Sequence, residues 1–486
     1  MQIKKYGVML NMSQNAVMKI ERLKDFANIV NKMGYSSLHI YIRDNFEIEG
    51  YPYFGYMRGK YSIAELIELR EFCDFIGIDI VVHVETLANL GGYDWECFAK
   101  IVDGGVLHYE NNETYDFLNC MFSSLAKAFK GKTIHLGKYN ENLFGVGKHR
   151  VEEKKTRREV INEHLRKVKE IATLHGLNPI VWGDSSITEQ IDVANDGAFL
   201  GAENSVKWCF VDAVTATGFA SGNDETVHKI EKLKQKEVDV ENFVVVLNKP
   251  NGGDFSFYGW LPSLFVVKNG KNQIEKFNEI VGLDIDALMK FDRMNFVGGN
   301  QLNSKPISKY MLYNDPFNGF FDSTVKDGIN QEYQELAKEF NIAEHTVISK
   351  LNAFCKTLCN VLSIKYDLGV RTRKVYMARD GKELSDLIDD YFKVETLVYQ
   401  LIDDFMAFWD SENKPQGREI QELRLGGIYM RLKSCRQRLV LLFNGEISEI
   451  PELERDVLDL YGKTNDKSKE PSSIGEWGMS VTGNII

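Results

Sequence analysis

The chain has 486 residues, of which 44% are hydrophobic and 27% are charged, as in a folded globular protein. Its 59 basic and 70 acidic residues give a net charge of -11, and no dense run of lysine and arginine is present, so nucleic acid is excluded as an expected partner. The length is sufficient for one domain of roughly 250 residues and a second domain of ordinary size.

The sequence carries no signal for export or for membrane insertion. Residues 1–10 pass directly into a predicted strand, without a long apolar stretch or a small-residue cleavage site. No apolar run approaches the ~18 residues of a membrane-spanning helix. The seven cysteines are odd in number and scattered, which favours a reducing compartment. We therefore expect a cytoplasmic protein that does not insert into a membrane.

Strands and helices alternate over residues 1–294. Ser62 and Glu65 have the spacing of a helix-capping box, and Gly34 and Gly77 follow the ends of two periodic segments, as helix-terminating glycines do. The predicted strands are residues 6–10, 38–42, 79–85, 133–136, 179–184, 206–211 and 243–248, and the predicted helices are residues 15–33, 62–76, 114–129, 151–175, 224–235 and 274–290.

Strands that alternate with helices of this size predict βα units and a parallel sheet, and we expect a (β/α)8 barrel of the TIM type. Only seven strands are evident, whereas a closed barrel of this type needs eight. Either a degenerate strand lies between Asp184 and Val206, or the barrel is open there.

After the predicted barrel domain, residues 1–294, comes a polar connector, residues 295–330. Residues 331–486 are predicted to form a helical C-terminal domain packed as a bundle. The helices that we expect in it cover residues 332–368, 382–409 and 418–443, with a short helix near Leu453.

The stretch from Thr133 to Lys148 is a buried strand that opens into a glycine-rich loop, the position from which a parallel barrel presents catalytic side chains. It resembles the fourth-strand motif of the family 20 glycoside hydrolases, the β-N-acetylhexosaminidases, in which His-Ile-Gly-Met-Asp-Glu is followed by Gly-x-Gly. The histidine and glycines keep this spacing, whereas the Asp-Glu pair is replaced (His135, Gly137, Gly145, Gly147; Tyr139-Asn140).

The resemblance covers most of the chain and points to the bacterial branch of the family that has a helical C-terminal domain. It implies the barrel fold and a carbohydrate partner, and it implies no cofactor. The further segments that carry it are residues 34–38, 52–62, 86–90, 182–184, 251–254, 261–264 and 424–427, together with Arg431.

In that family the acetamido oxygen of the substrate attacks the anomeric carbon, an Asp orients the acetamide, and the adjacent Glu protonates the leaving oxygen. Neither Tyr139 nor Asn140 suits these roles, because a phenol with a pKa of ~10 is a poor acid and an amide donates no proton. The resemblance further aligns the sugar-binding Arg of the family with Gln14, its Trp-rich wall with residues 212–218 and its Trp-Gly-Asp with residues 247–249.

Glu141 is the one carboxylate beside the replaced pair. A one-residue bulge would let Asn140 orient the acetamide and Glu141 act as the acid. Without the bulge, Glu141 is a solvated loop carboxylate.

His83 and Glu85 are two residues apart on the third predicted strand, so both face the same side, and His135 is expected to face the same interior. The three side chains would form either a metal or acid/base cluster or a hydrogen-bonded polar layer. The polar layer is the favoured interpretation, and we predict no metal site.

Asp44, Asp184 and Asp254 are predicted at strand ends on one mouth of the barrel. They would bind sugar hydroxyls or a basic ligand, or else cap their own loops. Arg58 is expected to hold its loop by pairing with a carboxylate, the alternative being contact with substrate.

These observations predict a carbohydrate-active barrel protein. Our first hypothesis is that it binds or hydrolyses a terminal amino-sugar glycoside with a divergent active site, as a glycoside hydrolase if it is active. The alternative is a catalytically inactive descendant of the family that binds a glycan or a protein partner. The sequence gives no indication of the oligomeric state.

Overall fold

The computed structural model of the protein describes residues 1–13, 16–90, 99–138, 155–182, 191–196, 205–213, 223–247, 257–299, 307–340 and 347–462. The chain divides into two compact units. The barrel unit consists of Met1–Ala213, Asp224–Gly253 and Pro262–Leu283, and the helical unit consists of Val214–Asn223, Asp254–Leu261 and Asp284–Ile486.

Eight parallel strands form the core of the barrel unit. Strand β1 pairs with both β10 and β2, which closes the ring in the order β1-β10-β9-β8-β7-β6-β3-β2. The predicted TIM-type barrel is therefore confirmed. The strands are β1 Gln2–Asn11, β2 Ser37–Arg43, β3 Asp79–Val84, β6 Thr133–Lys138, β7 Asn178–Trp182, β8 Asp192–Asp196, β9 Ser205–Asp212 and β10 Asp239–Leu247, beside a separate antiparallel pair, β4 Val102–Asp103 and β5 Val106–Leu107.

Strand β8 is the eighth strand, whose residues show no clear strand pattern. It pairs in parallel with β7 on one side and β9 on the other. The expectation of a degenerate strand between Asp184 and Val206 is confirmed, and the alternative of an open barrel is wrong. The segment escapes recognition because three of its five residues, Asp192, Asn195 and Asp196, are polar and interrupt any apolar pattern.

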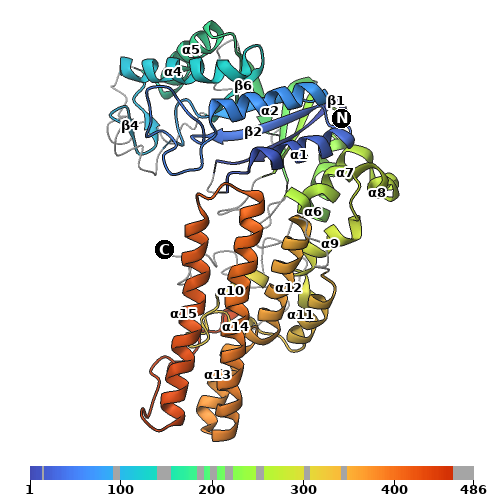
Figure 1. The fold of residues 1–486 in the computed structure, drawn as a ribbon. Helices are drawn as coiled ribbons and strands as arrows, with labels where there is room; N and C mark the ends of the chain where they lie inside the picture. Colours follow the sequence, from blue (N-terminus) through green and yellow to red (C-terminus); the bar gives the residue numbers. More distant parts are fainter. Residues whose placement is uncertain are drawn as a thin grey trace. The chain divides into compact units, whose positions relative to one another are not determined.

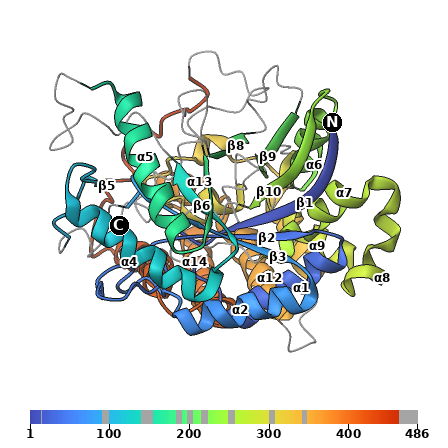
Figure 2. The same ribbon diagram turned by 90° about the horizontal axis from the view of Figure 1, so that it is seen from above.

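Helices α1, α2, α4 and α5 lie around the outside of the strands (Figure 2). The predicted capping box of α2 is confirmed, because Ser62 Oγ accepts from Glu65 N and Glu65 Oε2 accepts from Ser62 N. A second capping box, Thr156 with Glu159, begins α5. The helices of the barrel unit are α1 Ile20–Lys32, α2 Ile63–Ile76, α4 Asn112–Phe129, α5 Arg157–Leu174, α6 Asn223–Lys234, α7 Leu261–Asn269, η5 Lys271–Lys276 and α8 Phe277–Val281.

Three predicted helices differ from the observed ones. The helix predicted over residues 151–175, α5, begins only at Arg157, because Thr156 is extended and caps it. Helix α1 begins at Ile20 rather than at residue 15, because Lys19 is still extended. The predicted helix over residues 274–290 is broken: Gly282 adopts a left-handed conformation, with φ of 79°, and ends α8. Asp284 then begins a new helix, α9, by accepting a hydrogen bond from Asp286 N.

Helices make up most of the helical unit, and α14 and α15 lie side by side (Figure 1). The predicted helix over residues 332–368 is wrong in extent, because residues 339 and 340 lie outside any helix. The segment near Leu453 forms turns rather than the predicted helix. The helices are η4 Phe257–Trp260, α9 Ile285–Arg293, η6 Val297–Gly299, α10 Ile307–Tyr313, η7 Asp322–Thr324, α11 Ile329–Lys338, α12 Val347–Lys365, α13 Leu368–Ala378, α14 Gly381–Glu412 and α15 Arg418–Phe443.

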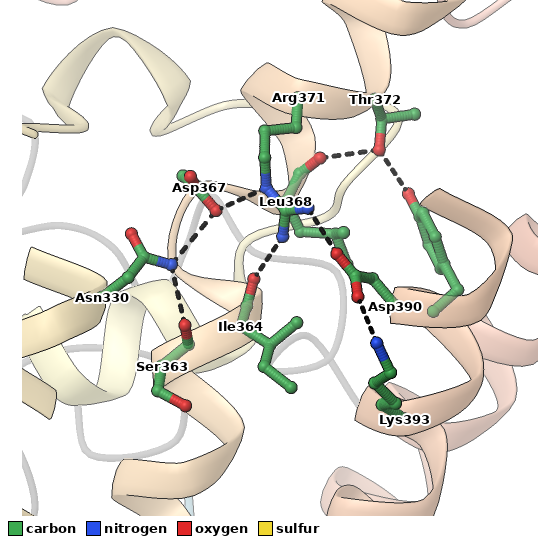
Figure 3. A network of polar contacts seen from close by, with 10 residues as sticks. Asn330, Ser363, Ile364, Asp367, Leu368, Arg371, Thr372, Asp390 and Lys393 are labelled. Atoms are coloured by element: carbon green, nitrogen blue, oxygen red, sulfur yellow. Dashed lines mark hydrogen bonds and ion pairs between the residues drawn. The ribbon is translucent and has the colours of Figure 1, made fainter. Parts of the chain in front are cut away.

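Arg371 on α13 connects three of these helices (Figure 3). Its guanidinium donates to Asp367 Oδ1 at 2.9 Å and to Asp390 Oδ2 on α14 at 2.7 Å. It also donates to the carbonyl oxygen of Ile364 on α12. Charge-assisted hydrogen bonds from one planar group therefore fix the junction of α12, α13 and α14.

In the part of the chain that the structure describes, no helix is both long and apolar enough to span a membrane.

Candidate functional site

The register of the barrel strands places four side chains in one layer of its interior. Tyr41 on β2 is the partner of His83 on β3, which is the partner of His135 on β6, which in turn is the partner of Ile180 on β7. Successive interior-facing residues are two apart along a strand. His39 therefore lies one layer further from the carboxyl-terminal mouth, and Glu85, which follows β3, lies one layer nearer to it.

Three histidines form a column of polar contacts through this interior. Ser37 Oγ lies 3.1 Å from His39 Nε2, and His39 Nδ1 lies 2.9 Å from His83 Nε2. The rings of His83 and His135 are stacked, and Gly137 N donates to His135 Nδ1 at 3.1 Å. Of the residues predicted to form a polar layer, His83 and His135 are thus stacked on each other, and the hydrogen bonds extend from them to His39, Ser37 and Gly137.

Burial keeps these histidines neutral. It lowers the pKa of His39 and of His135 to about 3, and it lowers the pKa of His83 well below its usual range. For His39 and His83, neighbouring imidazoles add to the effect. Because Nδ1 of neutral His135 accepts a hydrogen bond, its Nε2 carries the hydrogen. That atom is buried and has no partner among the described residues. No group of three or more described His, Cys, Asp or Glu residues has the arrangement of a metal site.

Gly7 on β1 makes room for one end of the column. A Cβ atom at this position would lie 2.4 Å from Ser37 Oγ and 3.2 Å from His39 Nε2. A glycine inside a strand often marks the close approach of another group, and here that group is the Ser37–His39 pair.

Tyr41 and Glu85 form a hydrogen-bonded pair near the mouth. The Tyr41 hydroxyl donates to Glu85 Oε1 at 2.7 Å. Glu85 is 3% exposed, whereas Tyr41 is half-buried. Burial, and next the charge of Glu85, raises the pKa of Tyr41 well above its usual value, so the phenol stays protonated. The pair therefore combines a buried carboxylate with a phenol whose hydrogen is donated to it and whose ring is partly open toward the mouth.

Gly137 packs against the other oxygen of Glu85. It has a φ of 96°, in the left-handed region, and a Cβ atom there would lie 2.3 Å from Glu85 Oε2. Only glycine adopts this conformation readily while leaving space for the carboxylate. The glycine of the motif that follows the fourth barrel strand is thus explained by Glu85.

Apolar side chains form the floor beneath the mouth. Tyr41 and Trp182 are only partly buried and pack against a buried cluster. The cluster consists of Met9, Ile180, Trp208, Phe210, Val244 and Val246. The ring of Trp182 lies 5.2 Å from that of Phe210 and 6.1 Å from that of His135. An indole and a phenol therefore remain partly open at the carboxyl-terminal end of the strands.

Ion pairs fix the loops that follow β1 and β2. Asp44 Oδ1 accepts from Arg43 Nε at 3.0 Å and from Arg58 Nη2 at 3.3 Å. Arg58, which is 4% exposed, also donates to the carbonyl oxygen of Ser13 at 2.6 Å. The interpretation of Arg58 as a residue that holds its loop through a carboxylate is confirmed, and Asp44 is that carboxylate.

The structure brings three of the predicted site residues together and leaves others undescribed. His83, Glu85 and His135 share the barrel interior, and Asp44 lies just after β2. The other predicted site residues lie outside the described residues, and their roles stay predictions: Gln14, Tyr139, Asn140, Glu141, Asp184 and Asp254.

Sequence reasoning missed His39 and Tyr41. The available signal was their spacing, because two polar residues separated by one apolar residue on β2 face the same side of the sheet.

The solved structures to which the chain is similar include the following three. The β-N-acetylhexosaminidase of Bacteroides fragilis is 14% identical, over 57% of this chain and 69% of that chain, with a TM-score of 0.44. The exo-β-N-acetylglucosaminidase of Vibrio harveyi, in complex with N-acetylglucosamine, is 10% identical over 57% and 58%, with a TM-score of 0.41. The β-N-acetylhexosaminidase of Streptomyces coelicolor is 14% identical over 57% and 69%, with a TM-score of 0.41.

No curated protein has a significant sequence match to the chain. A family model does match: residues 285–472 fit the Glycoside Hydrolase 20C C-terminal domain. This match lies in the region for which the motifs of the sequence predict the helical domain of the bacterial branch. Residues 285–472 are therefore similar to the C-terminal domain of the glycoside hydrolases 20C, and the resemblance to the family 20 glycoside hydrolases is confirmed.

Proposed function

We propose that this protein binds a terminal amino-sugar glycoside at the carboxyl-terminal mouth of its barrel. One observation carries the proposal: the half-buried rings of Trp182 and Tyr41 lie at the floor of the mouth, and Tyr41 is bonded to the buried carboxylate of Glu85. Aromatic rings offer a pyranose an apolar face, and a few fixed polar groups beside them orient its hydroxyls. The resemblance to family 20 supports an amino sugar as the ligand class.

We further propose that the active site has diverged from that of the hexosaminidases. The Asp-Glu pair that the family uses is replaced by Tyr139-Asn140. Substrate-assisted cleavage needs a proton donor and a carboxylate to balance developing positive charge, and a phenol and an amide serve these needs poorly. Binding is therefore the primary function that we propose. A second candidate function is hydrolysis with Glu141 as the acid, which the position of that carboxylate beside the replaced pair favours.

Calorimetric titration of the full chain with methyl β-N-acetylglucosaminide and methyl β-N-acetylgalactosaminide tests binding. We expect saturable binding of at least one glycoside, weakened at least tenfold by Trp182→Ala and largely retained by Trp182→Phe, which keeps an aromatic face. Circular dichroism of each variant controls for folding. The absence of binding by the wild type, or equal binding by Trp182→Ala, would contradict the proposal.

Turnover of the corresponding chromogenic glycosides tests the second candidate function. Hydrolysis that is abolished by Glu141→Gln identifies an active hydrolase with a rebuilt acid. Binding without turnover supports a catalytically inactive glycan-binding protein. If neither glycoside binds and neither is hydrolysed, the alternative of a protein-interaction descendant is favoured, and affinity capture with the full chain then provides the next test.

A further inference from the structure

The hydrogen of the Tyr41 hydroxyl already takes part in a hydrogen bond within the protein. It points to Glu85 Oε1 across 2.7 Å, within the range of a strong hydrogen bond to a carboxylate. A phenol has one hydrogen to donate, and its oxygen accepts through lone pairs. No described residue donates a hydrogen bond to that oxygen. Tyr41 therefore presents an acceptor, and no donor, toward the open end of the barrel.

Glu85 is itself firmly placed. Glu85 is 3% exposed, and the second oxygen of its carboxylate, Oε2, packs against Gly137 on β6. The left-handed backbone of Gly137 leaves no other residue type room beside it. The backbone of β3 and β6 and the Tyr41 hydroxyl thus fix the carboxylate, so it cannot readily turn away and release the phenol hydrogen.

The surroundings of Tyr41 and Glu85 favour one direction of their hydrogen bond, with Tyr41 as the donor and Glu85 as the acceptor. The interior histidines below it are neutral, so none of them supplies a positive charge to compete for the carboxylate. Tyr41 also remains protonated over the ordinary pH range, because burial and the charge of Glu85 both oppose its ionisation. The acceptor character of its oxygen is therefore a constant feature of the site.

We infer that Tyr41 is a specificity-determining residue, which accepts a hydrogen bond from a hydroxyl or amide N–H group of the bound sugar, and that Glu85 is the positioning residue that enforces this polarity. The inference rests on the proposed function, because it needs a sugar at the mouth. The inference also specifies one property of the ligand: the sugar carries a hydrogen-bond donor at the position that faces β2. A ligand with hydrogen or fluorine at that position loses this bond.

A double-mutant cycle between protein and ligand tests the inference. Calorimetric titration compares methyl β-N-acetylglucosaminide with its 3-, 4- and 6-deoxy analogues, on the wild type and on Tyr41→Phe. We expect Tyr41→Phe to weaken binding of the parent glycoside about tenfold. On the wild type, one deoxy analogue should bind about tenfold more weakly than the parent glycoside. On Tyr41→Phe, this analogue and the parent glycoside should bind with equal affinity.

Tyr35→Phe is the matched control. It removes the same hydroxyl from a buried tyrosine of the barrel unit, whose partner is the carbonyl oxygen of Leu264 at 2.8 Å. We expect this variant to lower the melting temperature without changing the affinity for any of the four glycosides. A loss of affinity in Tyr35→Phe equal to that in Tyr41→Phe would show a general structural effect and overturn the inference.

The role of Glu85 is tested by Glu85→Met, an apolar side chain of similar length that frees the Tyr41 hydrogen. Tyr41 then donates as well as accepts, so the deoxyfluoro analogue at the decisive position should regain affinity relative to the deoxy analogue. No such change in preference would overturn the positioning role. If Glu85→Met does not fold, the Tyr41→Phe cycle alone decides the specificity role.

Failure of the inference and failure of the proposed function give different results. Binding of the parent glycoside with the same affinity by the wild type and by Tyr41→Phe overturns the inference and leaves the proposed function standing. Additive losses from Tyr41→Phe and from every deoxy analogue also overturn the inference alone. The absence of binding by the wild type overturns both.

Discussion

The imidazole rings of His83 and His135 lie face to face inside the barrel, with their centroids 4.5 Å apart and their planes inclined by 8°. Each ring also makes an edge contact with Phe210. Two stacked imidazolium ions at this distance would repel strongly in an interior of low dielectric. Burial in addition lowers the pKa of each ring, so both are neutral near pH 7, which has a measurable consequence for folding.

We predict that the barrel unit loses stability as the pH falls from about 6.5 towards 4. The pKa of His39 and of His135 is about 3 in the folded protein, below the ~6.5 of an unfolded chain. The unfolded state therefore binds more protons in this range, and protonation favours unfolding. For each such histidine, the free energy of unfolding falls by up to about 1.4 kcal/mol for each pH unit by which the pH is lowered in this range. Urea unfolding at pH 7, 6 and 5 measures the slope.

His135→Gln provides the test of the cause. Glutamine keeps a polar side chain but does not titrate. The number of protons taken up on unfolding should therefore fall by about one, and the dependence of the unfolding free energy on pH should become shallower accordingly. His175→Gln, which removes a histidine bonded to Asn119 at the outer surface, should leave the slope unchanged. An unaltered slope in His135→Gln would show that this histidine does not carry the effect.

Replacing Gly137 with alanine should destabilise the barrel unit by at least about 2 kcal/mol, from the left-handed backbone and from displaced neighbours together. The new Cβ would lie 2.3 Å from Glu85 Oε2 and 2.8 Å from the carbonyl oxygen of Val84. Gly50→Ala is the matched control: its φ is 83°, but nothing lies within 4 Å of the added atom. The control should cost about 1 kcal/mol. Equal losses in the two variants would argue against the contact with Glu85.

Gly7→Ala should destabilise the protein through a contact that a second substitution relieves. The added Cβ would lie 2.4 Å from Ser37 Oγ, whereas the next atoms are 3.2 Å away. We expect a loss of about 1–3 kcal/mol, typical of overpacking. Ser37→Ala should recover about half of it in the double variant, because it removes the closest atom. Purely additive losses, measured by denaturant unfolding, would contradict this explanation.

These two glycines show how far the sequence was informative. The glycine that follows the fourth barrel strand was recognisable as part of a motif, but its partner Glu85 lies 52 residues earlier and is brought close only by the pairing of β3 with β6. Period-two spacing predicted that His83 and Glu85 face one side, and His135 was expected to face the same interior from a neighbouring strand, where it is the register partner of His83. The spacing did not specify which ring stacks on which, because that depends on register.

Secondary structure was predictable where local signals were strong. The Ser62–Glu65 capping box is observed, and α15 begins and ends at the predicted residues, Arg418 and Phe443. Strand β8 was expected only as one of two alternatives, and the break at Gly282 was not predicted, since the first is stabilised by its neighbours and the second depends on a left-handed glycine within an apparently periodic segment. Tertiary context overrides local pattern in both cases.

Arg371 should contribute measurably to the stability of the helical unit. Its three partners lie on or beside α12, α13 and α14, and its side chain is 33% exposed (Figure 3). We expect Arg371→Ala to lower the unfolding free energy by about 1–2 kcal/mol, because partial exposure screens the ion pairs. Lys393→Ala is the control: it removes a 60% exposed partner of Asp390 and should cost less than about 0.5 kcal/mol. Equal effects of the two substitutions would contradict the bridging role.

Asp322 in the helical unit should respond to pH in the opposite direction from the barrel histidines. Burial raises its pKa to about 6, although Arg373 and Lys365 lie near enough to oppose the shift. The folded state therefore binds a proton more readily than the unfolded chain, whose aspartate pKa is ~3.9. The stabilisation of the folded state by protonated Asp322 is fully present below about pH 4 and is lost as the pH rises through 6.

Asp322→Asn should consequently stabilise the helical unit at pH 7, by about 1–2 kcal/mol, and should give no gain at pH 4. The asparagine oxygen can still accept from Asn314 Nδ2, which lies 2.9 Å from Asp322 Oδ1, so the local hydrogen bond is preserved. Denaturant unfolding at both pH values measures the difference. A variant that is less stable than the wild type at pH 7 would show instead that the charged carboxylate, by holding the cations around it, outweighs the cost of its burial.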